Sequence, residues 1–222
     1  TPGPHTFTRE KVGTRYVALA IRTFVDPNDP KDVEQAHALQ DGIKTSQPGG
    51  PGKFEAPKWD MVSQKKVRDA LDVLGSTIVG FDHAFGTRAE VDPIRHLIGT
   101  ARGWGGNPDK DARYDSAKPD HNDGKTNYVL HVKDVPVDGF WSITVYNAKG
   151  FYEAPENAVS VNNVTAKRDP DGGITIHFGG DPSQPNYLHI MPGWNYTVRM
   201  YRPRKEILDG TWKFPEAQPL DE

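Results

Sequence analysis

Aromatic and amide side chains recur together along the sequence, and they are its clearest sign of binding chemistry. Trp and Tyr faces stack on sugar rings and other flat ligands, while Asn supplies both a hydrogen-bond donor and an acceptor. The set comprises Trp104, Asn107, Tyr114, Asn122, Trp141, Tyr146, Asn147, Trp194, Asn195 and Tyr196. Arg199 lies beside this group in a predicted strand and is the candidate partner for an anion. The alternative is structural: aromatics build β cores, Asn populates turns, and Arg199 lies at the surface.

The acid–base candidates are His121 and Asp123. Together with Asp120 they form the densest local set of ligand-type and titratable side chains. We predict that His121 and Asp123 are catalytic and line the main cleft, because Asn122-Asp123-Gly124 forms a turn just before the first predicted β strand.

Histidine spacing gives no support to a metal site. The eight histidines include no His-x-His or His-x-x-x-His pair, so we predict neither a metal nor another cofactor. His131 and His177 fall in predicted strands and could face each other across a sheet, although surface histidines are the alternative.

Several other reaction classes lack their motifs. The chain has no cysteine, which excludes thiolate nucleophiles, disulfides and Cys-type zinc sites. It has no Gly-x-Ser-x-Gly motif of the kind that carries a nucleophilic serine. The glycine-rich segment 103–106 follows a helix and matches neither a P-loop nor a dinucleotide fingerprint. A carboxylate pair for glycoside chemistry stays open, since sequence does not give the separation of two acids.

The composition of the chain argues against some classes of binding partner. A net charge of −3 over 222 residues argues against a broad nucleic-acid surface, and no apolar run is long enough to span a bilayer. A chain without cysteine fits any compartment, and we favour a periplasmic or secreted location over a cytoplasmic one. A removed signal peptide, a trimmed tag or an arbitrary boundary of the sequence would each explain a chain that begins at Thr1.

Helix signals fill the first half of the sequence. Asp29 and Pro30 predict a helix start, and the segment ends at Gly49-Gly50. A second helix is predicted from about Asp60 to Leu74. Thr87 and Glu90 match a capping box, and Asp92-Pro93 offers a second start for a short third helix.

After residue 125 the periodicity changes from that of a helix to that of a strand. Strands are predicted over 128–133, 140–146, 174–178 and 196–201, with turns at 136–139 and 169–173. We therefore predict an α+β fold in a single domain, 1–222. Residues 1–125 are predicted to be mainly helical, and residues 126–222 to form an antiparallel, jelly-roll-like β-sandwich on which the helices pack.

Several longer motifs carry a family resemblance. They are Leu97-Ile98-Gly99-Thr100-Ala101, Trp104-Gly105-Gly106-Asn107-Pro108, Val135-Pro136-Val137-Asp138-Gly139-Phe140-Trp141-Ser142 and Pro192-Gly193-Trp194-Asn195-Tyr196. With these motifs the chain resembles, from about Arg22 to Pro219, a mostly bacterial family defined by the domain of unknown function numbered twelve-fourteen. The resemblance implies a jelly-roll-like C-terminal domain, often paired with the domain of unknown function numbered twelve fifty-four. This chain is too short to hold that partner in full, and the resemblance implies no reaction.

Two functions remain open. The first is a pocket for a polar small molecule or carbohydrate, with hydrolase or lyase activity as one option. The second is a non-enzymatic structural or assembly module, in which jelly-roll edges pack into a homo-oligomer.

Overall fold

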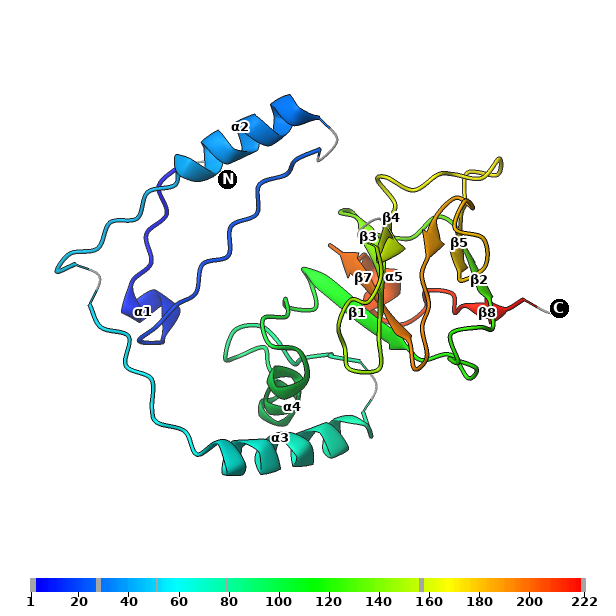
Figure 1. Ribbon diagram of the computed structural model, residues 1–222. Coiled ribbons are helices and arrows are strands. Elements are labelled where there is room, and N and C mark those ends of the chain that lie inside the picture. Colours follow the sequence, from blue (N-terminus) through cyan, green and yellow to red (C-terminus); the bar gives the residue numbers. More distant parts are fainter. Residues whose placement is uncertain (1–2, 27–28, 51, 79, 156–157, 221–222) are drawn as a thin grey trace. The chain divides into compact units, whose positions relative to one another are not determined.

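The chain divides into two units in the computed structural model, Thr1–Lys58 and Trp59–Glu222. The structure describes residues 3–26, 29–50, 52–78, 80–155 and 158–220 (Figure 1). Within these ranges it contains five helices and two four-stranded sheets, and the longer helices precede the strands. The predicted α+β class is confirmed.

The first unit holds α1 (Arg9–Val12) and α2 (Pro30–Asp41), joined by extended chain (Figure 1). The predicted start of α2 is confirmed, because the Asp29 side chain accepts a hydrogen bond from the Lys31 amide at 2.9 Å. The helix ends at Asp41, earlier than predicted, since Gly42 follows and glycine is a poor helix former.

The second unit begins with α3 (Met61–Gly75), which the Asp60 carboxylate caps through the amides of Val62 and Ser63. It continues with α4 (Pro93–Gly103), which is capped by Asp92. The capping-box hydrogen bond forms, since the Thr87 amide donates to Glu90 at 2.9 Å. Residues 88–90 nevertheless form a turn, and the helix starts at the second signal, Pro93.

Helices α3 and α4 pack against each other. A Cβ added at Gly75 would lie 3.1 Å from Ile98 Cγ2, so glycine permits the close approach. The Arg102 side chain donates to the Gly75 carbonyl across the contact. Val67 and Leu74 of α3 stay exposed.

The strands form two sheets. The first has the order β1-β7-β3-β4 with antiparallel neighbours, and the second has the order β6-β5-β2-β8 with one parallel pair, β5 and β6. The first sheet contains β1 (Ala112–Ala117), β7 (Asn195–Tyr201), β3 (Trp141–Tyr146) and β4 (Ser160–Asn162). The second contains β6 (Tyr187–Leu188), β5 (Ile174–Phe178), β2 (Tyr128–Val132) and β8 (Gln218–Pro219). The short helix α5 (Lys205–Leu208) follows β7.

One hydrophobic core joins the two sheets. Alternate residues of β3 and β7 point into it, such as Ile143 and Val198, and they share one cluster with Leu130 of β2 and Ile176 of β5. The intervening residues of each strand therefore face outward. This alternation places the polar side chains of both sheets.

Strand β1 differs from the sequence prediction, which starts the β region after residue 125. Its six residues, Ala-Arg-Tyr-Asp-Ser-Ala, hold no aliphatic residue larger than alanine, so the pattern lacks an apolar alternation. The strand forms because β7 supplies a full antiparallel ladder, from Ala112 opposite Tyr201 to Ala117 opposite Tyr196.

No helix among the described residues is long and apolar enough to cross a membrane.

Candidate functional site

The outer side of the first sheet carries a continuous polar surface, which we call the Arg199 face. Register places Arg199 of β7 between Tyr114 of β1 and Ser142 of β3. The next outward row holds Ser116, Thr197 and Thr144. The face comprises Tyr114, Ser116, Ser142, Thr144, Tyr146, Asn195, Thr197 and Arg199.

The Arg199 guanidinium lies at the centre of this face and is half-buried. One Nη donates to Thr144 Oγ1 at 3.1 Å, and the other donates to the Tyr146 hydroxyl. Its Cζ lies 5.7 Å from the centroid of the Tyr146 ring. Among the described residues, no carboxylate forms a salt bridge with Arg199. Hydroxyl groups therefore hold a positive charge that no anion of this part of the chain neutralises.

Hydroxyl groups also contact one another around Arg199. Thr144 Oγ1 lies 3.2 Å from Ser160 Oγ, and Ser160 donates to the Ile143 carbonyl at 2.9 Å. On the other flank, Ser116 Oγ lies 3.1 Å from Thr197 Oγ1. These contacts fix the side chains that surround the guanidinium.

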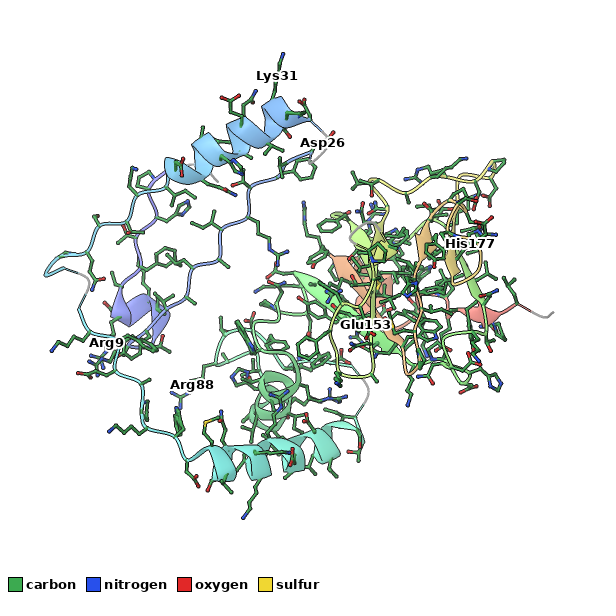
Figure 2. The ribbon with its side chains drawn as sticks, viewed as in Figure 1. Arg9, Asp26, Lys31, Arg88, Glu153 and His177 are labelled. Atoms are coloured by element: carbon green, nitrogen blue, oxygen red, sulfur yellow. The ribbon has the colours of Figure 1, made fainter. Side chains whose placement is uncertain are left out.

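A loop after β3 adds a second aromatic ring. Tyr152 stacks on Tyr146 with centroids 5.4 Å apart. Burial, followed by the neighbouring Tyr146, raises the pKa of Tyr152, although Arg199 opposes the shift. The Tyr152 hydroxyl therefore stays protonated at neutral pH, where it is a hydrogen-bond donor and a poor base. Glu153, labelled in Figure 2, accepts from Asn147 Nδ2 at 2.7 Å in the same loop.

The structure brings five of the predicted ligand-binding residues to this face or its rim: Asn107, Tyr114, Tyr146, Asn195 and Arg199. Asn107 Nδ2 donates to the Tyr114 hydroxyl at 2.7 Å. Asn195 Nδ2 donates to the carbonyl of Asn147 at 3.2 Å. Alternation in β3 and β7 is the signal that groups Tyr146 with Arg199.

The other predicted aromatics lie elsewhere. Trp141 and Trp194 are only 3% and 0% exposed and belong to the shared core, so neither offers a face to a ligand. The indole Nε1 of Trp194 has no hydrogen-bond partner among the described residues. Trp104 is exposed in the loop after α4.

The residues of the predicted catalytic pair, His121 and Asp123, are exposed neighbours in the loop between β1 and β2. The Asp123 carboxylate accepts from the amides of Lys125 and Thr126, both at 2.8 Å, and these bonds lower its pKa. In the same loop Asn122 donates to the Trp194 carbonyl at 2.9 Å. The structure therefore uses Asp123 and Asn122 to shape this loop.

A cavity of about 490 Å³ opens beside β4 and β6. It is lined by Pro155, Ala158, Ser160, Val161, Thr165, Ala166, Pro182, Gln184, Asn186, Tyr187 and His189. None of the predicted site residues lines this cavity. Tyr187 and His189 contact each other there at 3.3 Å, and no sequence motif marks either residue.

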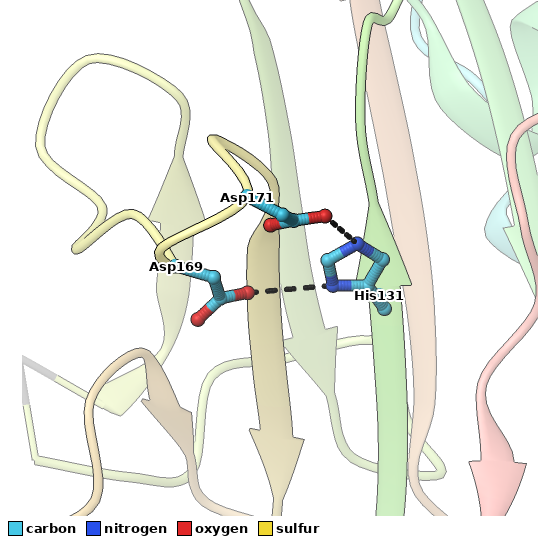
Figure 3. A group of neighbouring side chains, drawn as sticks. All are labelled: His131, Asp169 and Asp171. Atoms are coloured by element: carbon cyan, nitrogen blue, oxygen red, sulfur yellow. Dashed lines mark ion pairs between the residues drawn. The ribbon is translucent and has the colours of Figure 1, made fainter.

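The two strand histidines lie on the outer side of the second sheet. His131 of β2 is opposite Thr175, while His177 of β5, which Figure 2 labels, is opposite Val129, and this register makes the two histidines diagonal neighbours on one face. His177 Nδ1 is buried without a partner among the described residues. His131 lies close to Asp169 and Asp171 (Figure 3). Among the described residues, these three form a group whose ligand atoms are close enough together to hold a metal ion.

Sequence reasoning missed Ser142, Thr144, Thr197 and Tyr152 as neighbours of Arg199. Three of them are outward members of strands whose inward members are apolar, which is a signal that the sequence contains. Tyr152 reaches the face through a loop, and no pattern predicts that contact.

Comparison with protein families identifies one domain. Residues 111–205 match the family described as "Protein of unknown function (DUF1214)", which confirms the predicted resemblance for the C-terminal region of the chain. The predicted pairing with a second domain of unknown function is not shown. No curated protein matches the chain.

The solved structures that are similar to this chain include the following two. The VPA0106 protein from Vibrio parahaemolyticus has a TM-score of 0.56 at 23% identity, over 96% of this chain and 61% of that one. The two share a fold, and this chain spans about three fifths of the length of that protein. An uncharacterized protein from Burkholderia cenocepacia has a TM-score of 0.37 at 15% identity, over 74% of this chain and 42% of that one.

Proposed function

We propose that the Arg199 face binds a small polar ligand that carries an anionic group and several hydroxyls, such as a sugar acid. The observation that carries the proposal is the half-buried Arg199 guanidinium, which two hydroxyls orient and no carboxylate of the described chain neutralises. A guanidinium has five N–H donors in a planar fork that matches a carboxylate.

Partial burial makes an unpaired Arg199 charge energetically costly. A partly buried charge loses hydration, and neutral hydroxyls replace water only in part. An anion that paired with Arg199 would restore the lost solvation through charge-assisted hydrogen bonds. The ligand's charge therefore supplies the main attraction.

The surroundings favour a ligand with many hydroxyls. Ser116, Thr197 and Tyr114 each offer a donor and an acceptor beside the guanidinium. Tyr146 and Tyr152 form a stacked pair at one end, and such aromatic surfaces suit the apolar face of a sugar ring.

Binding is better supported than hydrolase or lyase chemistry. Catalysis of either kind needs a group that moves a proton near neutral pH. The raised pKa of Tyr152 keeps its hydroxyl protonated at neutral pH, so it does not accept a proton there, and Glu153 accepts a hydrogen bond from Asn147. The described residues of the face thus include no positioned general base. Hydrolase or lyase chemistry at this face would need the ligand itself to supply that base.

The test compares matched acid and neutral sugars by thermal shift and calorimetry. Glucuronate should raise the melting temperature of the protein, and glucose should not. The shifts produced by galacturonate, gluconate and citrate should differ according to how well each anion fits the face. Arg199→Gln should weaken binding by about tenfold to a hundredfold, because a hydrogen bond to a charged group contributes about 1.5–3 kcal/mol.

Arg204→Gln is the matched control. Arg204 is more than half exposed and pairs with Asp138 at 2.7 Å, and neither residue belongs to the Arg199 face. This variant should bind as the unmodified protein does. If no anion of the panel binds, or if Arg199→Gln binds as tightly as Arg204→Gln, the proposal is wrong.

One observation favours the second candidate, an assembly module. Residues 17–25 are extended, yet their backbone amides and carbonyls make no hydrogen bond to the described residues. Val17, Leu19, Ile21 and Phe24 are 54%, 50%, 59% and 89% exposed. An unpaired, extended apolar segment is a template for strand pairing, and a second copy of this chain offers an identical segment.

Light scattering after gel filtration tests the assembly candidate. The unmodified chain should elute as a homo-oligomer, and Ile21→Lys should shift it to the monomer. Leu39→Lys is the control, because Leu39 is 66% exposed on α2 and lies outside the extended segment. A monomeric unmodified chain would exclude this function.

The β region is best described as a jelly-roll-like sandwich. Successive strands alternate between the sheets in most steps, such as β1 to β2 and β2 to β3, and both sheets contribute to one core. That crossing pattern is typical of jelly rolls. The parallel pair β5 and β6 departs from it.

A further inference from the structure

A second polar group lies on the outer side of the second sheet and shares no residue with the Arg199 face. Figure 3 shows Asp169 and Asp171, on the turn before β5, on two sides of the His131 ring, which projects from β2. His131 Nδ1 is 3.3 Å from Asp169 Oδ2, and Nε2 is 3.4 Å from Asp171 Oδ2. All three residues reach solvent in part.

The turn holds its carboxylates in place. The Asp169 amide donates to the Gly173 carbonyl, and the Gly173 amide donates to Asp171 Oδ1, both at 2.9 Å. Thr175, which is opposite His131 in the ladder, donates to Asp169 Oδ2 at 2.7 Å. A Cβ at Gly173 would collide with His131 Cε1, so only glycine admits the ring here.

We propose that His131, Asp169 and Asp171 form a binding site for a divalent transition-metal cation such as Zn²⁺ or Co²⁺. Imidazole nitrogen and carboxylate oxygen are ordinary ligands of these ions. Two ligands at zinc bonding distance from a tetrahedral ion are about 3.4 Å apart. The separation of Nδ1 and Asp169 Oδ2 matches that spacing.

Asp171 completes the set after a small movement. One ligand atom from each residue lies within 4.8 Å of the others, whereas two ligands of a tetrahedral zinc ion are about 3.4 Å apart. Asp171 is half exposed, and its Oδ2, which the Gly173 amide does not hold, is the oxygen that turns toward the ion. Three protein ligands leave a coordination position for water or a further ligand.

The charge of the group favours a cation. Two carboxylates face one imidazole, and Lys133 adds a positive group whose Nζ is 3.9 Å from Asp171 Oδ2. Lys133 and the imidazolium form of His131 compete with the metal for these carboxylates. The titration below distinguishes a bound metal ion from these internal positive groups.

Calorimetric titration of the tag-free full chain with ZnCl₂, CoCl₂ and MgCl₂ tests the site. Zn²⁺ and Co²⁺ should bind at one site per chain, and Mg²⁺ should not compete, because it prefers oxygen ligands. His131→Ala and Asp169→Asn should each weaken Zn²⁺ binding by at least tenfold. Bound Co²⁺ should shift and broaden the NMR signals of the His131 ring and the Gly173 amide.

His83→Ala is the matched control. His83 Nδ1 lies 3.4 Å from Asp109 Oδ2 but has only this one carboxylate beside it among the described residues. The variant should bind Zn²⁺ as the unmodified chain does. The proposal fails if the unmodified chain shows no one-site binding, or if Asp169→Asn, which keeps the size of the side chain, binds Zn²⁺ undiminished.

Discussion

Replacement of Gly124 by alanine tests whether the loop of His121 and Asp123 is a packed structural element. Gly124 has φ +79°, and a Cβ there would lie 2.6 Å from both the Met191 carbonyl carbon and the Pro192 nitrogen. Gly150 has φ +82° with nothing within 4 Å of a Cβ. The pair therefore separates backbone strain from steric contact.

The magnitudes follow from the two geometries. An L-residue in the left-handed region costs about 1–2 kcal/mol, partly offset by the reduced entropy of the unfolded chain, so Gly150→Ala should lower the unfolding free energy by about 1 kcal/mol. Gly124→Ala adds the displacement of a neighbouring backbone. Overpacking of this kind costs about 1–3 kcal/mol more, which gives a total of about 2–4 kcal/mol.

Urea unfolding followed by tryptophan fluorescence measures the difference. The buried Trp141 and Trp194 report on the β core. Trp194 also follows closely in sequence on Met191 and Pro192, the residues that a Cβ at Gly124 would displace. Equal losses for the two variants would refute the packed loop. His121 and Asp123 would then be free to adopt another arrangement, as the catalytic prediction requires.

Three further predictions concern stability. The Thr87 amide, followed by Lys110, holds the pKa of Glu90 at about 2, below its ordinary value of 4.5. The ionised Glu90 therefore stabilises the fold fully above about pH 4.5, and this stabilisation is lost as the pH falls toward 2; Glu90→Gln should flatten the acid dependence of the melting temperature over that window. Ile176→Ala in the core should cost about 2–5 kcal/mol in urea unfolding, whereas Val164→Ala, at an exposed position, should change it by less than about 0.5 kcal/mol. Asp123→Ala should lower the melting temperature more than Asp123→Asn does, because an amide oxygen still accepts from the Lys125 and Thr126 amides.

Local signals made the elements with strong caps and alternation predictable. Asp29, Asp60 and Asp92 each start a helix at the predicted place, because capping depends on a few neighbouring atoms. The strands at 128–132 and 174–178 follow from their apolar alternation. Strand β1 escaped prediction because its order depends on β7, a partner more than seventy residues away in the chain.

The candidate site was predictable only in part, and for the same reason. Arg199 and Tyr146 could be grouped from strand alternation, whereas Trp141 and Trp194 were placed with them by residue type alone. Alternation assigns Trp141 to the apolar side with Ile143 and Val145, which becomes the core. His131 meets Asp169 and Asp171 only through the pairing of β2 with β5, so a spacing rule along the chain finds no metal ligands.

The two proposed sites should act independently, and this supplies a further test. Their side chains project outward from different sheets, whose inward residues share one tightly packed core. Effects of substitutions at sites without common contacts usually add. Zn²⁺ affinity should therefore be the same in Arg199→Gln as in the unmodified chain, and glucuronate affinity should be unchanged in His131→Ala. Loss of both affinities in either variant would mean that the substitution had disturbed the core rather than a site, and the ligand assignments would then rest on Arg199→Lys and Asp169→Asn, which change the side chain least.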